Sequence, residues 1–210
     1  MTKRFSDIAR QILGRDPRGL DDPKTTTTMT TTPAVWRAFL RDVGGEEELL
    51  SAFQRFHTGH LDVVEGVVVF AEENQNVMVW GWRVDDAHLD DPPVFQLVST
   101  DEGPDGPFAE DANLSDFIAA TLVLQATWGG DIMPLLGSVE RGHGMQAVLE
   151  TEGLRVVATA GALTALLGDE VAATVVKDEH GETVIVGCAK EADFERIADA
   201  LGADADFFEL

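Results

Sequence analysis

Two short segments hold the carboxylates that are best spaced for chemistry: the adjacent pair Glu72 and Glu73, and a group of aspartates just after it. The aspartates are Asp85, Asp86, Asp90 and Asp91. Adjacent residues of an extended segment point to opposite faces, so Glu72 and Glu73 would not meet one substrate atom as general acid and base. The aspartates could crowd a hard cation, but their spacing lacks the calcium-loop pattern. We therefore expect both segments to serve the structure or a partner surface.

The other residues able to do chemistry do not form a recognisable catalytic or metal-binding pattern. His57 and His60 have no third histidine or cysteine nearby, whereas a zinc site needs three or four ligands. Cys188 ends an apolar run, which favours a buried thiol. No glycine-rich phosphate loop follows a strand, and Gly137-Ser138 lacks the pattern of a nucleophile elbow. The sequence therefore predicts no enzyme activity, no cofactor and no metal.

Hydrophobic periodicity predicts an order of helices and strands that would position the two acidic segments. Helices are expected at 5–13, 33–43, 46–56 and 115–128, and strands at 67–71, 77–82 and 94–98. The polar residues Glu72 to Asn76 are expected to form the turn of a β-hairpin between the first two strands. Residues 85–91 and 100–113 are expected to be loops. The threonine run at 25–28, beside Asp21-Asp22-Pro23, favours a linker over an edge strand.

The helix expected at 115–128 is apolar on nearly all sides and should lie deep in the core. Ser115 is expected to cap it, with Leu114 as the preceding apolar staple residue. Tryptophans bury large areas, so the simplest expectation for all four is a core position. They are Trp36, Trp80, Trp82 and Trp128.

After residue 130 the pattern predicts a second group of short elements. Strands are expected at 154–157, 171–176 and 183–187, helices at 160–167 and 191–201, and a hairpin turn at 178–182. We expect these elements either to extend the same sheet or to pack beside it.

Three short pieces resemble the SMI1/KNR4 family of the SUKH superfamily. They are Phe70-Ala71-Glu72-Glu73-Asn74-Gln75, then Trp80-Gly81, then Asp91-Pro92-Pro93-Val94. The resemblance covers residues 33–130 and implies an α+β fold, a mixed sheet with flanking helices. It also implies a protein-binding domain, in bacteria often an immunity protein that neutralises a toxin. We accordingly divide the chain into a helix with a Thr-rich linker (1–32), a SUKH-like core (33–130) and a C-terminal α/β extension packed on the same domain (131–210).

Composition limits the classes of partner and the compartment. The formal net charge is −23, and residues 84–140 contain 12 acidic side chains and no Lys or Arg. Such a surface repels phosphate backbones, so nucleic-acid binding is disfavoured. No apolar run could span a bilayer, no apolar segment follows the basic N-terminal pair as in a signal peptide, and the single cysteine fits the cytoplasm.

The sequence thus predicts a non-enzymatic binding protein whose acidic surface meets a basic partner, by resemblance a toxin and possibly a nuclease. The expected contact residues are Glu72, Glu73, Asp85, Asp86, Asp90 and Asp91. Two alternatives remain open at this point: a regulatory or scaffolding module without a toxin partner, and a small-ligand or metal binder. The acidic composition is also compatible with a role in solubility alone.

Overall fold

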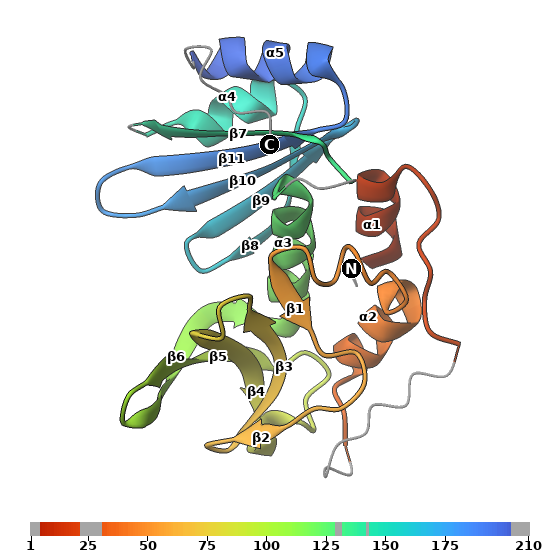
Figure 1. The fold of residues 1–210 in the computed structure, drawn as a ribbon, viewed down its shortest axis with the longest axis vertical. Helices are drawn as coiled ribbons and strands as arrows, with labels where there is room; N and C mark the ends of the chain where they lie inside the picture. Colours follow the sequence, from red (N-terminus) through yellow and green to blue (C-terminus); the bar gives the residue numbers. More distant parts are fainter. Residues whose placement is uncertain (1–4, 22–30, 129–131, 142, 203–210) are drawn as a thin grey trace.

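The protein folds as two antiparallel β-sheets that share one long helix, α3 (Leu114–Thr127), between them (Figure 1). The computed structural model describes residues 5–21, 31–128, 132–141 and 143–202. The threonine run expected to form a linker lies outside these residues. The architecture is α+β, as expected, but the expectation of a mixed sheet is wrong, because every strand pairing of the described residues is antiparallel. None of the described helices is long and apolar enough to cross a membrane.

Sheet 1 lies in the first half of the chain and is covered by helices on one face. Its strands are β1 (Gln54–Phe56), β2 (Val63–Val64), β3 (Val67–Glu73), β4 (Met78–Arg83), β5 (Pro93–Thr100) and β6 (Gly103–Asn113), in the order β1-β3-β4-β5-β6 with β2 paired to β3. A short 3-10 helix, η1 (Val84–Asp86), follows β4. Helices α1 (Phe5–Leu13) and α2 (Ala34–Val43) pack with α3 against this sheet.

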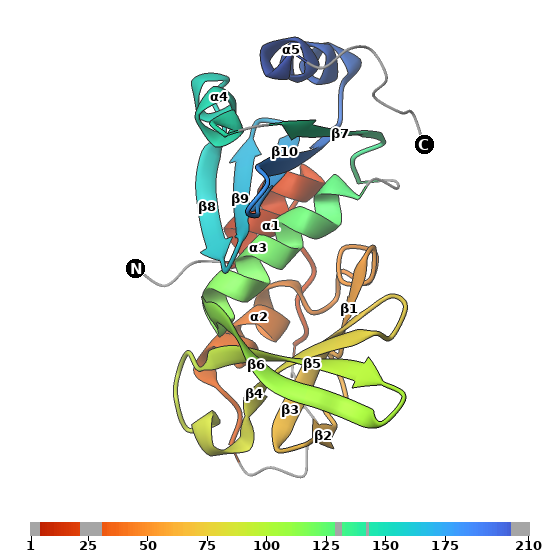
Figure 2. The ribbon, with the colours of Figure 1, turned by 90° about the vertical axis from the view of Figure 1, so that its left-hand side faces the viewer.

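Sheet 2 is formed by the residues after 130, so they pack beside the first sheet and do not extend it. Its strands are β7 (Leu135–Arg141), β8 (Arg155–Ala160), β9 (Leu163–Gly168), β10 (Val171–Lys177) and β11 (Glu182–Cys188), in the order β7-β11-β10-β9-β8. Helices α4 (Met145–Thr151) and α5 (Glu191–Leu201) cover one face, and α3 covers the other (Figure 2).

The position of α3 explains why its sequence is apolar on every side. Ile118, Ala119 and Leu122 are fully buried, because the helix contacts both sheets and the helices α1 and α2. Sheet 2 presents small residues such as Ala165 and Ala172 to it, which allow a close approach. The expected core helix is therefore confirmed. Ser115 is not its N-cap, however, because the helix already begins at Leu114.

Aromatic side chains fill the space between sheet 1 and its helices. Trp36 lies 5.4 Å from Phe70 and 5.8 Å from Trp82, measured between ring centroids. Trp80 is also buried, so the core expectation is confirmed for three tryptophans. It is wrong for Trp128, which is 41% exposed and stacks on Phe53 at 4.2 Å.

Three expected elements differ in the structure. Residues 46–56 form turns and β1 and not a helix, residues 100–113 form β6 and not a loop, and residues 160–167 contribute to β9 and not to a helix. In each case the backbone pairs with another strand, and these pairings override local propensity. β7 and α4 were not expected at all.

Candidate functional site

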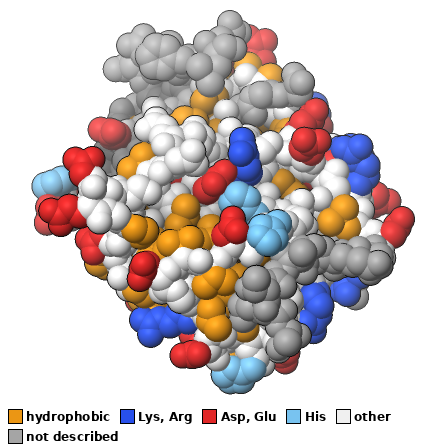
Figure 3. Space-filling model, turned by 60° about the horizontal axis from the view of Figure 1, so that its bottom comes forward, with side chains coloured by type: hydrophobic (Ala, Val, Ile, Leu, Met, Phe, Trp, Pro, Cys, Tyr) orange, Lys and Arg blue, Asp and Glu red, His pale blue; other side chains and the backbone are white. Residues whose placement is uncertain are grey.

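The end of sheet 1 that holds β2 and η1 exposes apolar and acidic side chains together. We call it the lower surface and define it by Val63, Glu65, Val84, Asp85, Asp86, Leu89 and Asp90. The backbone N–H of Val84 donates to the carbonyl of Gly66 at 2.9 Å, which joins η1 to the β2–β3 turn. Figure 3 looks at this end of the molecule and shows hydrophobic side chains among acidic ones.

The apolar members of the lower surface are large side chains that remain open to solvent. Val63 is 42% exposed, Val84 37% and Leu89 38%, which makes them three of the seven exposed large hydrophobic side chains in the described chain. Apolar side chains inside a polar rim are typical of protein interfaces. This end of the molecule therefore has the composition of a binding surface.

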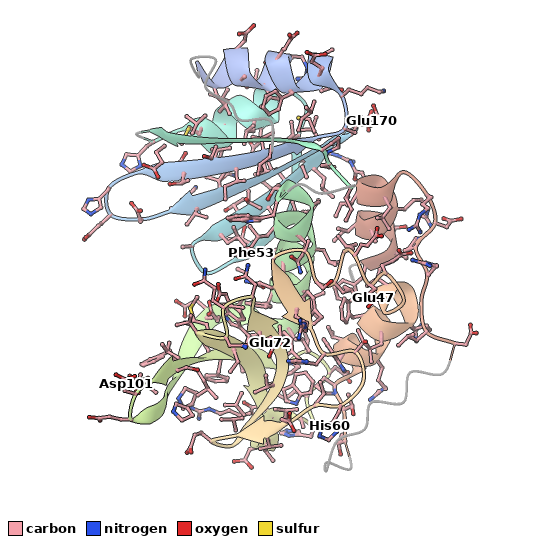
Figure 4. All side chains as sticks on the ribbon, viewed as in Figure 1. Glu47, Phe53, His60, Glu72, Asp101 and Glu170 are labelled. Carbon is pink, nitrogen blue, oxygen red and sulfur yellow. The ribbon has the colours of Figure 1, made fainter. Side chains whose placement is uncertain are left out.

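The acidic members of the lower surface are not neutralised by an ion pair with any other described side chain. Within the described residues, no ion pair involves Glu65, Asp85, Asp86 or Asp90. Nearby, Asp62 lies 3.1 Å from the imidazole of His60, and Figure 4 shows His60 at this end of the sheet. Their charges are thus available to an incoming cationic group.

Asp91, which the sequence predicted to contact a partner, is engaged within the fold. Its carboxylate accepts hydrogen bonds from the backbone N–H of Ser115 at 2.8 Å and from the Ser115 hydroxyl at 2.6 Å. It therefore satisfies an amide in the first turn of α3. The preceding carbonyl, of Asp90, accepts a bond from Val35 at the start of α2.

Glu72 and Glu73 are also engaged within the fold. β3 continues through both residues, so they end a strand and do not form the turn that the sequence predicted. The Glu72 carboxylate lies 3.3 Å from the guanidinium of Arg55 and 3.4 Å from His57 (Figure 4). Glu73 is 8% exposed and accepts a bond from the backbone N–H of Gln75. Neither offers a free carboxylate to a partner.

The two predicted acidic segments lie at opposite ends of β4, so they do not form one surface. Glu72 pairs with Val79 near the start of β4, whereas Asp85 follows its end. The extended path from Val79 to Asp85 is about 20 Å long. Of the six predicted contact residues, the structure brings together Asp85, Asp86 and Asp90 on the lower surface.

A second acidic group, which sequence reasoning missed, lies at the turn between β5 and β6. Asp101, Glu102 and Asp105 are exposed there, and Figure 4 shows Asp101 at the tip of this hairpin. The backbone N–H of Ser99 donates to the carbonyl of Val77 at 2.8 Å, which places this turn beside the β3–β4 turn. The run Asp101-Glu102-Gly103 between polar and apolar stretches could have been recognised as a hairpin turn.

The described residues contain no group of three or more metal-ligating side chains that could hold an ion. His57 and His60 each lie beside one carboxylate, of Glu72 and Asp62 respectively. Burial raises the pKa of the Cys188 thiol to about 12, so it is not a reactive thiolate at neutral pH. The buried thiol expected from the sequence is confirmed.

Comparison of the chain with protein-family models, with curated proteins and with solved structures finds no match.

Proposed function

We propose that this chain is a non-enzymatic protein-binding domain of the SMI1/KNR4 type, and that it acts in the cytoplasm as an immunity protein that neutralises a basic toxin. An α+β fold with helices flanking the first sheet supports the family part of this proposal. The residues of the resemblance also have structural roles, since Phe70 and Trp80 are buried and Asp91 bonds to α3. Residues that hold a fold together are those that a family signature retains.

The observation that carries the binding function is the lower surface. Its exposed valines and leucine can be desolvated by a partner, and its unpaired carboxylates can meet basic side chains at the rim. The net charge of −23 adds a long-range field that accelerates encounter with a basic protein. A nuclease has the complementary charge, because its cleft must attract a phosphate backbone.

The experiment that tests this proposal is capture of the partner followed by a toxicity assay. The tagged full-length chain is incubated with native lysate of the producing cells at low and at high salt, and the bound proteins are identified. The expected partner is a basic protein that is retained at low salt, released at high salt, toxic when expressed alone and harmless when expressed with this chain. A basic partner that is not toxic would overturn the immunity role and leave a regulatory binding module.

A further inference from the structure

The strand β7 is an edge of sheet 2 that keeps a regular backbone along its whole length. It pairs with β11 over seven consecutive residues, from Leu135 with Cys188 to Arg141 with Glu182, without a register shift. Among the described residues, β11 is its only strand partner. Figure 2 shows β7 at the rim of the sheet, on the side opposite β8. In an antiparallel edge strand, about half of the residues point their N–H and C=O groups away from the sheet.

The other two long edge strands, β6 and β8, have features that hinder the addition of a further strand, and β7 lacks these features. β6 contains Pro104 and Pro107, and its pairing with β5 shifts register twice. The pairing of β8 with β9 also shifts register, and the turn that follows it lies against the carbonyl of Glu110. Prolines and bulges are the usual means of keeping an edge from adding another strand. β7 has neither, and no described strand pairs with its free edge, so this edge has the features that permit strand addition.

An anionic pocket lies at the C-terminal end of β7. It has a volume of about 350 Å³, and its lining includes Glu140, Asp178, His180 and Glu182. Glu182 is already engaged by Lys177 and by the backbone N–H groups of Gly144 and Met145, so the negative charge of the pocket comes chiefly from Glu140 and Asp178. Glu140 makes no ion pair with any described side chain. The backbone N–H groups of His180 and Gly181 lower the pKa of Asp178, which keeps this carboxylate ionised. A cationic side chain at the end of an added strand would meet this pocket.

We propose that β7 binds a basic, extended protein segment by strand addition, with a Lys or Arg side chain of that segment in the pocket beside Glu140. Backbone hydrogen bonds to β7 would supply affinity, and the charge of the pocket would select a basic segment. Charge complementarity favours this occupant over a second copy of the chain, because two molecules of net charge −23 repel each other. The surface lies on sheet 2, apart from the lower surface, so its test does not depend on the proposed function.

The test uses a fluorescent synthetic peptide of alternating valine and threonine with a lysine at each end, titrated into the full-length chain. Fluorescence anisotropy at low and high salt measures affinity, and amide hydrogen exchange locates the contact. We expect binding that weakens with salt and slower exchange in β7 but not in β6. Ser138→Lys, at an exposed position of β7, and Glu140→Gln should each weaken binding about tenfold at low salt.

The matched control is Glu102→Gln, which removes one carboxylate from the β5–β6 turn and should leave peptide affinity unchanged at high salt and nearly so at low salt. Three results would overturn the proposal: no peptide binding, unchanged affinity in Ser138→Lys, or slower exchange elsewhere than in β7. Self-association of the chain that Ser138→Lys abolishes would also overturn it, because a second copy would then occupy the edge.

Discussion

Glu46 is a buried carboxylate that holds the segment after α1 against the end of α2. The two terminal nitrogens of the Arg15 guanidinium, Nη1 and Nη2, each donate to one Glu46 carboxylate oxygen at 2.8 Å. The backbone N–H of Arg18 donates to the same carboxylate. These hydrogen bonds lower the pKa of Glu46 to about 2, with that of Arg15 the largest cause. The carboxylate therefore joins Arg15 and Arg18 to the segment that follows α2.

We predict that Glu46→Gln lowers the free energy of unfolding by roughly 2–3 kcal/mol at neutral pH, since Arg15 and the Arg18 amide lose a charged acceptor. The folded-state pKa lies below the ordinary value of 4.5, so the carboxylate stabilises the fold fully above about pH 4.5. That contribution is lost as the pH falls towards 2. Urea unfolding of both proteins between pH 7 and pH 2 measures the difference.

The control is Glu47→Gln, because the neighbouring Glu47 side chain is exposed and has no hydrogen bond or ion pair of its own among the described residues. It should change stability by less than about 0.5 kcal/mol at every pH. A stability difference between wild type and Glu46→Gln that stays constant down to pH 2 would contradict the assigned role of this charge.

At the scale of elements, the loop between η1 and β5 connects the starts of two helices. The Asp90 carbonyl accepts from Val35 at the start of α2, and the Asp91 carboxylate accepts from Ser115 in the first turn of α3. The carbonyl of Pro92 also accepts from the backbone N–H of Leu114. The adjacent aspartates thus have different roles, because Asp90 binds α2 through its backbone carbonyl and Asp91 binds α3 through its side chain.

This difference predicts that Asp91→Ala destabilises the protein by about 1–2 kcal/mol, the usual effect of losing a side chain that caps a helix. Asp90→Ala should change stability by less than about 0.5 kcal/mol, because the backbone carbonyl that bonds to α2 remains. Thermal and urea unfolding of the two variants give a direct comparison. Equal destabilisation by both changes would show that the loop does not act through the Asp91 carboxylate.

At the scale of the whole molecule, the carboxylates differ in whether groups of the same chain bind them. Carboxylates such as Glu46, Glu72 and Asp91 are bound to groups of the same chain, whereas those of the lower surface make no ion pair with any described side chain. Steering by charge depends on the local field around the docking site as well as on the net charge. The location of a charge change should therefore matter more than its size.

We predict that the triple variant Asp85→Lys, Asp86→Lys and Asp90→Lys slows association with the captured partner at least about tenfold at low salt. The reason is that it reverses the charge beside the exposed valines and leucine. Stopped-flow or surface-plasmon kinetics over a range of salt concentrations measure the association rate and its salt dependence. The far-ultraviolet circular dichroism spectrum should remain that of the wild type.

The matched triple variant is Glu150→Lys, Glu195→Lys and Asp199→Lys, which makes the same change in net charge on α4 and α5. It should slow association much less. If both triple variants slow association equally, the partner responds to net charge alone and the lower surface has no special role.

Local patterns in the sequence were sufficient to predict the elements whose apolar side chains form one clear stripe or run. The helix at 5–13 and the strands at 171–176 and 183–187 agree closely with α1, β10 and β11, because an apolar stripe or run reports burial directly. The apolar pattern at 115–128 likewise predicted a helix deep in the core. It did not predict that two different sheets would cover this helix.

Three elements depend on contacts with other parts of the fold more than on their own residue pattern. β1 is held by the side chain of Gln125, which accepts from the N–H groups of Phe53 and Gln54 and donates to the Gln54 carbonyl. β6 is polar and contains glycine and proline, so only its pairing with β5 makes it a strand. β9 contains alanine and leucine that favour helix, but it lies between β8 and β10.

The sequence by itself determined that the chain is acidic, that it has an α+β composition and that no familiar catalytic pattern is present. It could not determine which carboxylates face a partner. Glu72 meets Arg55 and Asp91 meets Ser115 only after the sheet and helices have formed. Whether a carboxylate is engaged within the fold depends on donors that are distant in the sequence and close in space, so only the tertiary structure could separate Glu72 and Asp91 from Asp85, Asp86 and Asp90, which make no ion pair with a described side chain.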